Sequence, residues 1–281
     1  RKGCATRRRF LLRLFSRTHN EGSPGGPGPL VTCRFEAKLR YNDRSMPAPR
    51  FTLKTLSFLR ALKRHNDREW FKVRREEYEQ HVRGPMIAVI ERLAEDFRRF
   101  APDLVASERV SLYRIYRDTR FSADKSPLKT HIAAVFPWRG LQKHEGAGLY
   151  FHVAPGEVWA GGGMYMPRTS QLQLVREHIA QHHDRLRAIV GKPSFTRKVG
   201  ALEGEKLSRV PRGFPKDHPA AEYLKFRQFL AGHEYPATCA TSPRFYPTLV
   251  ALFRDIAPLC AFLNEPLLRV PKDPLVSGFG L

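Results

Sequence analysis

Four short apolar runs follow one another in the middle of the chain with no helical pattern between them, and this succession constrains the fold more than any other feature. The runs are rich in β-branched and aromatic residues and cover residues 110–116, 131–136, 148–154 and 158–166. Pro155 and Gly156 separate the last two, which predicts an antiparallel hairpin with its turn at residues 154–157. Strands without crossover helices favour a mostly antiparallel sheet, and so an α+β fold rather than a doubly wound one.

Helical spacing of apolar residues occurs on both sides of these runs. Before them it predicts a helix from about residue 53, a second that Asn66 and Glu69 open as a capping box and that ends near residue 82, and a third from Pro85. After them, helices are expected at residues 167–179, 182–190, 220–226 and 247–263, and short strands within residues 193–235. We therefore expect helices to cover the sheet in a single domain over residues 46–281.

Residues 1–45 differ in composition from the rest of the chain. They open with the Arg-rich stretch RKGCATRRRFLLRLFSR and continue with the turn-forming EGSPGGPGP. Their eleven Lys and Arg and three Asp and Glu supply +8 of the formal net charge of +22 and leave +14 on the remainder. Since Met46 directly precedes ordered-looking sequence, we expect the natural start there and interpret residues 1–45 as a disordered or non-native basic leader. The alternative is an Arg-rich organelle-targeting segment.

The net charge and the cysteines restrict the class of protein. A basic chain of this kind favours anionic partners such as nucleic acid, phosphorylated metabolites or acidic lipid headgroups. Uninterrupted apolar runs fall short of the roughly eighteen residues of a membrane span, so no membrane partner is predicted. The four cysteines show no CxxC or metal-type spacing, which indicates reduced thiols and a cytoplasmic location.

The best candidate site lies between the first two apolar runs, where basic residues are concentrated around two acids. The predicted anion-binding residues are Arg114, Arg117, Arg120, Lys125, Lys129 and His131, and the acids are Asp118 and Asp124. Arginine forks bind planar oxyanions in a bidentate manner and lysine adds a point charge, so the cluster suits a phosphate or carboxylate group. Asp118 and Asp124 are the candidate catalytic acid/base pair, or ligands of magnesium.

A structural interpretation of the same cluster stays open. In a strand, Arg114 and Arg117 project to opposite faces, so they reach one ligand only if the chain bends at residues 117–118. Asp118 can pair with Arg120 or Arg114, and Asp124 can cap the turn at residues 126–127. The charges would then satisfy one another as a salt-bridge network without a ligand.

Three other groups of residues are weaker candidates. The glycine run at residues 161–163 is not followed by the Lys-Ser/Thr pair of a P-loop. This favours glycines that allow two backbone segments to approach closely over a loop that binds phosphate. The run can still form one wall of a pocket. The histidines at 178, 182 and 183 with Asp184 include an i, i+4 pair, but no third ligand matches them, so we predict no metal site and an exposed helix end. Residues 216–218 beside Arg212 form a loop that can approach the main site.

The cluster also carries a family resemblance. Its pattern is R-x-x-R-D-x-R-F followed by D-K, formed here by Arg114, Arg117, Asp118, Arg120, Phe121, Asp124 and Lys125. This pattern resembles the hallmark of the domain of unknown function 2461 family, whose members are conserved hypothetical proteins. The similarity extends over residues 51–263, with Leu128 where the family has Tyr. It implies the boundaries of the domain and places residues 1–45 outside it, but it implies no activity.

The sequence therefore leads to three functional hypotheses. The first is an enzyme or ligand-binding protein that acts on a phosphorylated or other anionic small molecule through the charged cluster. The second is a nucleic-acid-binding module, which the net charge favours and the absence of a zinc finger, helix-turn-helix or RNP pattern disfavours. The third is a structural or protein-interaction domain without a ligand. Reaction, cofactor, metal dependence and oligomeric state stay open at this point.

Overall fold

The computed structural model describes residues 47–120 and 122–269 of the chain. The predicted leader at residues 1–45, with Cys4 and Cys33, and the hallmark residue Phe121 lie outside the described residues. The interpretation of the leader therefore stays a prediction. Both described cysteines, Cys239 and Cys260, are free thiols.

A four-stranded antiparallel sheet forms the centre of the described structure. Its strands pair in sequence order, and they are β1 (Ile132–Phe136), β2 (Gly148–Val153), β3 (Glu157–Met164) and β4 (Phe229–Pro236). The predicted hairpin is present, because the Ala154 backbone N–H donates to the Glu157 carbonyl oxygen at 2.8 Å. The α+β fold with a mostly antiparallel sheet, predicted from the order of the apolar runs, is confirmed.

Helices precede and follow the strands, as the apolar spacing predicts. Before β1 they are α2 (Leu53–Arg64), α3 (Arg68–Val73), α4 (Arg75–Tyr78), the π-helical turn η1 (Glu79–Arg83), α5 (Gly84–Phe100) and α6 (Glu108–Ser111). After β3 they are α7 (Thr169–Gln181), α8 (His183–Val190), α9 (Pro193–Val199), α10 (Ala221–Leu224), the 3-10 turn η2 (Ala237–Thr241) and α11 (Phe245–Leu268).

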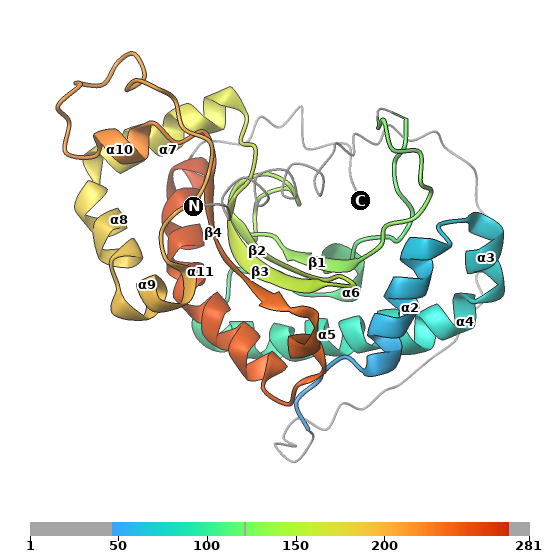
Figure 1. Ribbon diagram of the computed structural model, residues 1–281. Coiled ribbons are helices and arrows are strands. Elements are labelled where there is room, and N and C mark those ends of the chain that lie inside the picture. Colours follow the sequence, from blue (N-terminus) through green and yellow to red (C-terminus); the bar gives the residue numbers. More distant parts are fainter. Residues whose placement is uncertain (1–46, 121, 270–281) are drawn as a thin grey trace, which may run out of the picture.

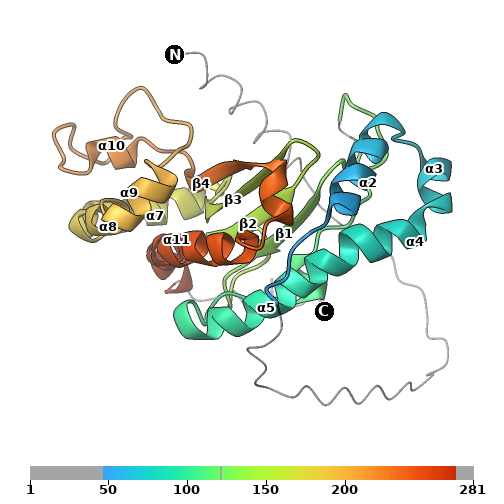
Figure 2. The ribbon, with the colours of Figure 1, turned by 60° about the horizontal axis from the view of Figure 1, so that its bottom comes forward.

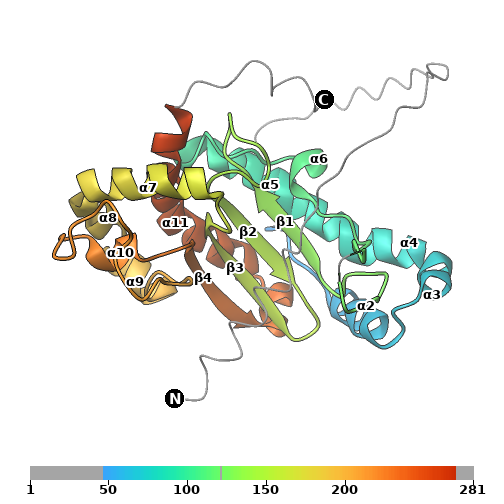
Figure 3. The same ribbon diagram turned by 90° about the horizontal axis from the view of Figure 1, so that it is seen from above.

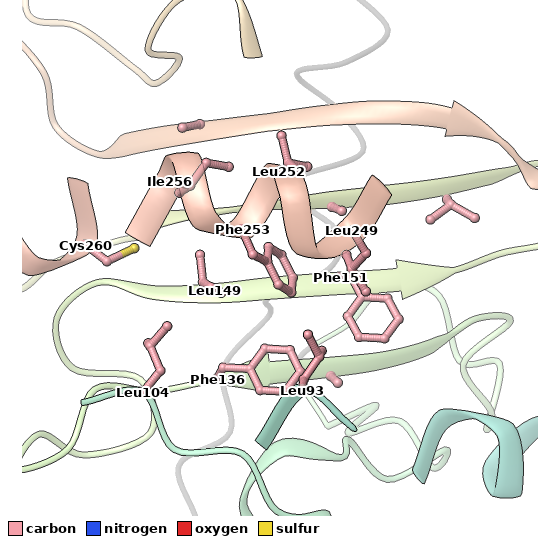
Figure 4. Packing of buried hydrophobic residues seen from close by; sticks show 14 of the residues in the cluster. Leu93, Leu104, Phe136, Leu149, Phe151, Leu249, Leu252, Phe253, Ile256 and Cys260 are labelled. Atoms are coloured by element: carbon pink, nitrogen blue, oxygen red, sulfur yellow. The ribbon is translucent and has the colours of Figure 1, made fainter. Parts of the chain in front are cut away.

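Two long helices, α5 and α11, lie side by side against one face of the sheet (Figures 1 and 2). The core between them and the strands is built from aromatic rings: Phe136 of β1 lies 5.2 Å from Phe97 of α5 and 5.8 Å from Phe253 of α11, centroid to centroid. Figure 4 shows Phe253 directed toward Phe151 of β2 and Phe136. Since these rings are almost fully buried, truncating one to alanine should destabilise the fold by about 3–5 kcal/mol.

Helix α11 is the most apolar element of the fold. Its length and hydropathy match those of a membrane-spanning helix, but 61% of its most apolar window is buried inside the fold. Asp255 in its middle is buried and pairs with Lys198 of α9 at 2.6 Å. The packing is that of a core helix, in the region where the apolar spacing predicts a helix at residues 247–263.

Within residues 47–120 and 122–269, helices flank the opposite face of the sheet and do not cover it (Figure 3). Seen from above, α2, α3 and α4 lie beyond the β1 edge and α7 to α10 lie beyond the β4 edge, with α5 and α11 behind the sheet (Figure 3). Strand alternation directs Ala133 and Val135 of β1 and Tyr150 of β2 toward this uncovered side, where they form a small separate cluster. This face is the place where a ligand can meet the sheet.

The prediction of a strand over residues 110–116 is wrong in part. Residues 110 and 111 belong to α6, because Ser107 caps that helix by accepting a hydrogen bond from the Val110 N–H at 3.3 Å. From residue 112 the chain is extended and runs antiparallel to residues 127–130. The Lys129 N–H donates to the Ile115 carbonyl at 2.8 Å, and the Arg117 N–H donates to the Pro127 carbonyl at 2.9 Å. We call this double-stranded excursion, residues 112–131, the site arm.

The predicted helix start at Asn66 is also wrong. Asp67 caps α3, since its carboxylate accepts from the backbone N–H groups of Glu69 and Trp70 at 2.8 and 3.0 Å. The expected continuous helix to residue 82 is interrupted at Arg74 and then passes through the π-helical turn into α5. Asn66 is thereby free for a contact with the site arm.

Candidate anion-binding site

A pocket with a volume of about 950 Å³ opens on the uncovered face of the sheet. Its floor includes Val135, Tyr150 and Trp159, one from each of three neighbouring strands. Its walls are the site arm, the loop of residues 142–147 that leads into β2, and the start of α7 at Arg168. We call it the sheet pocket.

Glycines shape the floor around Trp159. A Cβ atom at Gly161 would come within 2.6 Å of Trp159 Cη2, and one at Gly232 within 2.4 Å of Trp159 Cζ2. The six-membered ring of the indole therefore reaches over the backbone of β3 and β4, into space that any side chain at these two positions would fill. The predicted close approach in the glycine run is confirmed at Gly161, and Gly162 and Gly163 line the pocket as the predicted wall.

Two asparagines outside the sheet hold the walls in place. Asn66 clamps the site arm: its Nδ2 donates to the Leu128 carbonyl at 2.9 Å, and its Oδ1 accepts from the Leu128 N–H at 3.0 Å. Asn264 of α11 clamps the other wall in the same way, through the Ala147 N–H at 2.7 Å and the Ala147 carbonyl at 2.8 Å. Each clamp fixes the backbone close to a lysine that lines the pocket, Lys129 in one wall and Lys143 in the other.

These two lysines converge on one aromatic ring. Lys129 Nζ lies 4.9 Å and Lys143 Nζ 4.6 Å from the ring centroid of Tyr113, within the range of cation–π attraction. Burial, reinforced by the positive charges of Arg114, Lys143 and Arg117, lowers the pKa of Lys129 to about 8. Burial also lowers the pKa of Lys143.

Among residues 47–120 and 122–269 neither lysine has an acidic oxygen within 4.0 Å. Arg114 beside them also lacks one at this distance, but its side chain is exposed and its charge acts on the more distant Asp118. Cations that are desolvated without an anionic partner are costly. The hydroxyl of Tyr113 is also buried and has no hydrogen-bond partner in the described part of the chain. This end of the pocket is therefore electrostatically incomplete.

Histidines add neutral polar groups to the cationic end. His131 is largely buried, and burial together with the neighbouring His152, Lys129 and Arg117 lowers its pKa well below the usual value. His144 is exposed, and partial desolvation together with the charges of Lys143 and Lys129 lowers its pKa as well. At neutral pH both imidazoles are therefore uncharged, and they can donate a hydrogen bond to an anion without adding charge.

Arg114 and Arg117 both line the sheet pocket, although a straight strand would direct them apart. The chain bends at Ile115, two residues before the predicted position, and the bend brings both guanidinium groups to one side. Arg117 is fixed by Asp124 at 2.5 Å and by Ser122 at 3.3 Å.

The remaining basic residues of the predicted cluster serve the arm itself. Arg120 and Lys125 are exposed and do not line the pocket. Arg120 forms a two-pronged contact with Asp118, Nε to Oδ1 at 3.1 Å and Nη2 to Oδ2 at 2.9 Å, and Lys125 Nζ donates to the Thr119 carbonyl at 3.0 Å. The cluster thus divides into cations that form contacts within the site arm and cations that line the pocket.

Both aspartates also form contacts within the site arm. Hydrogen bonds from Arg120 lower the pKa of Asp118 to about 2. Hydrogen bonds from Ser126 and Arg117 hold the pKa of Asp124 well below its usual range, and Ser126 donates to it through both its backbone N–H and its hydroxyl. Both carboxylates line the pocket and are ionised at neutral pH, which makes them weak bases. Their predicted catalytic role stays a prediction.

A family model described as conserved hypothetical protein (DUF2461) matches residues 54–262, about three quarters of the chain. The chain belongs to this family. The match confirms the resemblance inferred from the charged pattern of the site arm. Comparisons with curated proteins and with solved structures found no match. Membership of the DUF2461 family brings no activity with it, so the function must be argued from the pocket.

The other candidates of this DUF2461 chain lie elsewhere. The rings of His178 and His182 are 4.7 Å apart, but His178 is buried against Phe262, so the interpretation as an exposed helix end is wrong for it. Within the described ranges, no three His, Cys, Asp or Glu residues are grouped to hold a metal ion. The loop at residues 216–218 does not line the sheet pocket.

Several pocket residues were not predicted as site residues: Tyr113, Lys143, His144, Tyr150 and the two clamping asparagines. Lys143 and His144 follow β1 in a polar loop, and the hairpin-like order of β1 and β2 was the available signal that this loop ends beside the site arm. The clamps have no such signal, because Asn66 meets a backbone 62 residues away and Asn264 one 117 residues away.

Proposed function

We propose that the sheet pocket binds a small molecule with a phosphate or carboxylate group, and that Lys129, Lys143 and Arg114 neutralise its charge. The observation that carries the proposal is the convergence of two desolvated lysines on Tyr113 without a carboxylate within 4.0 Å in the described structure. A fold that only needed a salt-bridge network would pair these cations, as it pairs Arg120 with Asp118. An anionic ligand would supply the missing partner.

The pocket's dimensions support a small ligand. A volume of about 950 Å³ lies in the range of sites for metabolites and cofactors, which enclose most of the ligand's surface. Arg117 at the arm and Arg168, which pairs with Glu145 at 3.1 Å, are placed to close around the bound molecule. In this proposal Asp118 and Asp124 hold the arginines of the arm in place. The proposal concerns the binding of a ligand and assigns no reaction to these carboxylates.

A thermal-shift screen of the full chain tests the proposal. The panel comprises sugar phosphates, nucleotides, polyphosphate, aryl carboxylates and short nucleic acids, each with and without magnesium or manganese. A ligand at a hundred times its Kd should stabilise the protein by about 2.7 kcal/mol.

The double variant Lys129→Met/Lys143→Met should lose the stabilisation by a small anion, whereas Lys125→Met, an exposed lysine of the same arm, should retain it. Stabilisation by nucleic acid alone, with a steep salt dependence, would favour the nucleic-acid-binding alternative instead. A flat screen would refute ligand binding and favour a structural or protein-interaction domain.

A further inference from the structure

The sheet pocket has two chemically different ends. Lys129, Lys143 and Tyr113 form a cationic end, whereas Trp159 lies on the far side of Tyr150 and offers an aromatic surface to the same pocket. A bare inorganic anion would contact only the cationic end and would leave the second end without a ligand contact. From this contrast, and resting on the proposed function, we infer that the natural ligand is a phosphate or carboxylate attached to a planar ring that stacks on Trp159.

The position of the indole is the first argument. The Cζ2 and Cη2 atoms of its six-membered ring lie over Gly161 and Gly232, where a Cβ atom would approach within 2.6 and 2.4 Å. The remainder of the ring is partly exposed and lines the sheet pocket, so a ligand can contact it there. Stacking on an aromatic side chain contributes about 1–3 kcal/mol per ring.

The spacing of the rings is the second argument. Tyr113, Tyr150 and Trp159 form a row across the sheet, with 6.3 Å between the first two centroids and 5.8 Å between the last two. The ring of Tyr113, over which both lysines lie, and the indole are therefore no more than about 12 Å apart, as the two separations together require. A compact molecule with an acidic group at one end and a ring at the other can contact both.

Calorimetric titration of the full chain at pH 8 with three probes tests the inference. Inorganic phosphate carries the anion alone, phenyl phosphate adds a flat ring, and cyclohexyl phosphate adds a puckered ring of similar size. Phenyl phosphate should bind tighter than inorganic phosphate by about tenfold or more, and cyclohexyl phosphate should fall between them. Trp159→Leu should remove the preference for phenyl phosphate without weakening inorganic phosphate, and Trp159→Phe should keep part of it.

Fluorescence gives a second reading that does not depend on the stability of the leucine variant. Of the three tryptophans, Trp70, Trp138 and Trp159, the sheet pocket is lined by Trp159. Phenyl phosphate should quench the emission of the wild-type protein and leave that of Trp159→Phe unchanged.

The inference is overturned if phenyl and cyclohexyl phosphate bind equally well, if neither binds tighter than inorganic phosphate, or if Trp159→Leu weakens all three probes alike. In each of these cases the proposed function stands, because inorganic phosphate still binds and Lys129→Met removes its binding. If no probe binds the wild-type protein, the proposed function fails and the inference fails with it.

Discussion

Replacing Lys129 with methionine should stabilise the protein. Methionine keeps an unbranched side chain, shorter by the terminal nitrogen, and removes a charge that burial and the surrounding cations disfavour. The pKa of Lys129 falls from 10.5 to about 8, and a tenfold change in acidity corresponds to about 1.4 kcal/mol. The charged lysine therefore costs the fold up to about 3 kcal/mol at pH 7, of which we expect Lys129→Met to recover about 1–3 kcal/mol because the pocket admits water.

The effect has a defined dependence on pH. Below pH 8 Lys129 is protonated in both the folded and the unfolded chain, so the full cost applies. Between pH 8 and about 10.5 the unfolded chain binds more protons than the folded one, and the stability of the wild-type protein rises through this lysine. The advantage of Lys129→Met should therefore be largest at pH 7 and should shrink by pH 10.

Urea denaturation of the full chain at pH 7 and pH 10 measures the stabilisation by Lys129→Met and its dependence on pH. Urea is suitable because it adds no salt that would screen the charges. Lys125→Met is the matched control: Lys125 belongs to the same arm and is exposed, so its replacement should change the free energy of unfolding by no more than about 0.5 kcal/mol. A Lys129→Met variant that is less stable than the wild-type protein at pH 7 would refute the reasoning. So would a variant that exceeds the wild type in free energy of unfolding by the same amount at pH 7 and pH 10.

Two further substitutions test the walls and the floor of the pocket. Asn264→Leu leaves the buried N–H and C=O of Ala147 without partners, so it should lower the free energy of unfolding by about 2–4 kcal/mol. It should also weaken phenyl phosphate binding, because the loop that carries Lys143 is released. A loss of stability below about 0.5 kcal/mol in urea denaturation would contradict the clamp. Gly161→Ala should cost about 1–3 kcal/mol because its Cβ would meet Trp159 and the backbone of β4, whereas Gly156→Ala, with open space around it, should be nearly neutral. Equal thermal stability of the two alanine variants would argue against the glycine floor.

The fold was largely predictable from the chain because its sheet is built from neighbours in sequence. The strands β1, β2 and β3 are joined by short connections and carry their signals locally, in the apolar runs and in Pro155 and Gly156 at the hairpin turn. Strand β4 pairs with β3 across residues 165–228, which include α7 to α10, and the sequence located it only as one of several short strands within residues 193–235. Local signals also explain the errors. The apolar run at residues 110–116 contains the last turn of a helix that Ser107 caps, and Asp67 beside Asn66 competes for the same capping position.

The site was predictable only as a region. The pattern around Arg117 marks the site arm, and it predicts the Asp118–Arg120 pair and the Asp124 cap of the turn at residues 126–127 as one of two interpretations; the structure confirms both contacts. Which cations are left for a ligand depends on burial and on contacts across the sheet, and Lys143 comes from a loop with no pattern of its own. Such properties arise from tertiary packing, so spacing along the chain does not encode them.

The uptake of a proton on ligand binding tests the central claim most directly. Calorimetric titration of the wild-type protein with phenyl phosphate at pH 8, repeated in buffers of different ionisation enthalpy, reports the protons exchanged. The probe is a dianion at this pH, because the second pKa of a phosphate monoester is about 6.

Since the pKa of Lys129 is about 8 in the free protein, a bound anion should draw in up to about half a proton per site through this lysine. Lys129→Met should bind phenyl phosphate much more weakly, and any remaining binding should take up fewer protons than in the wild-type protein. Binding with the same proton uptake in both proteins, or no binding at all, would contradict the assignment of Lys129 as the principal anion-binding residue of the sheet pocket.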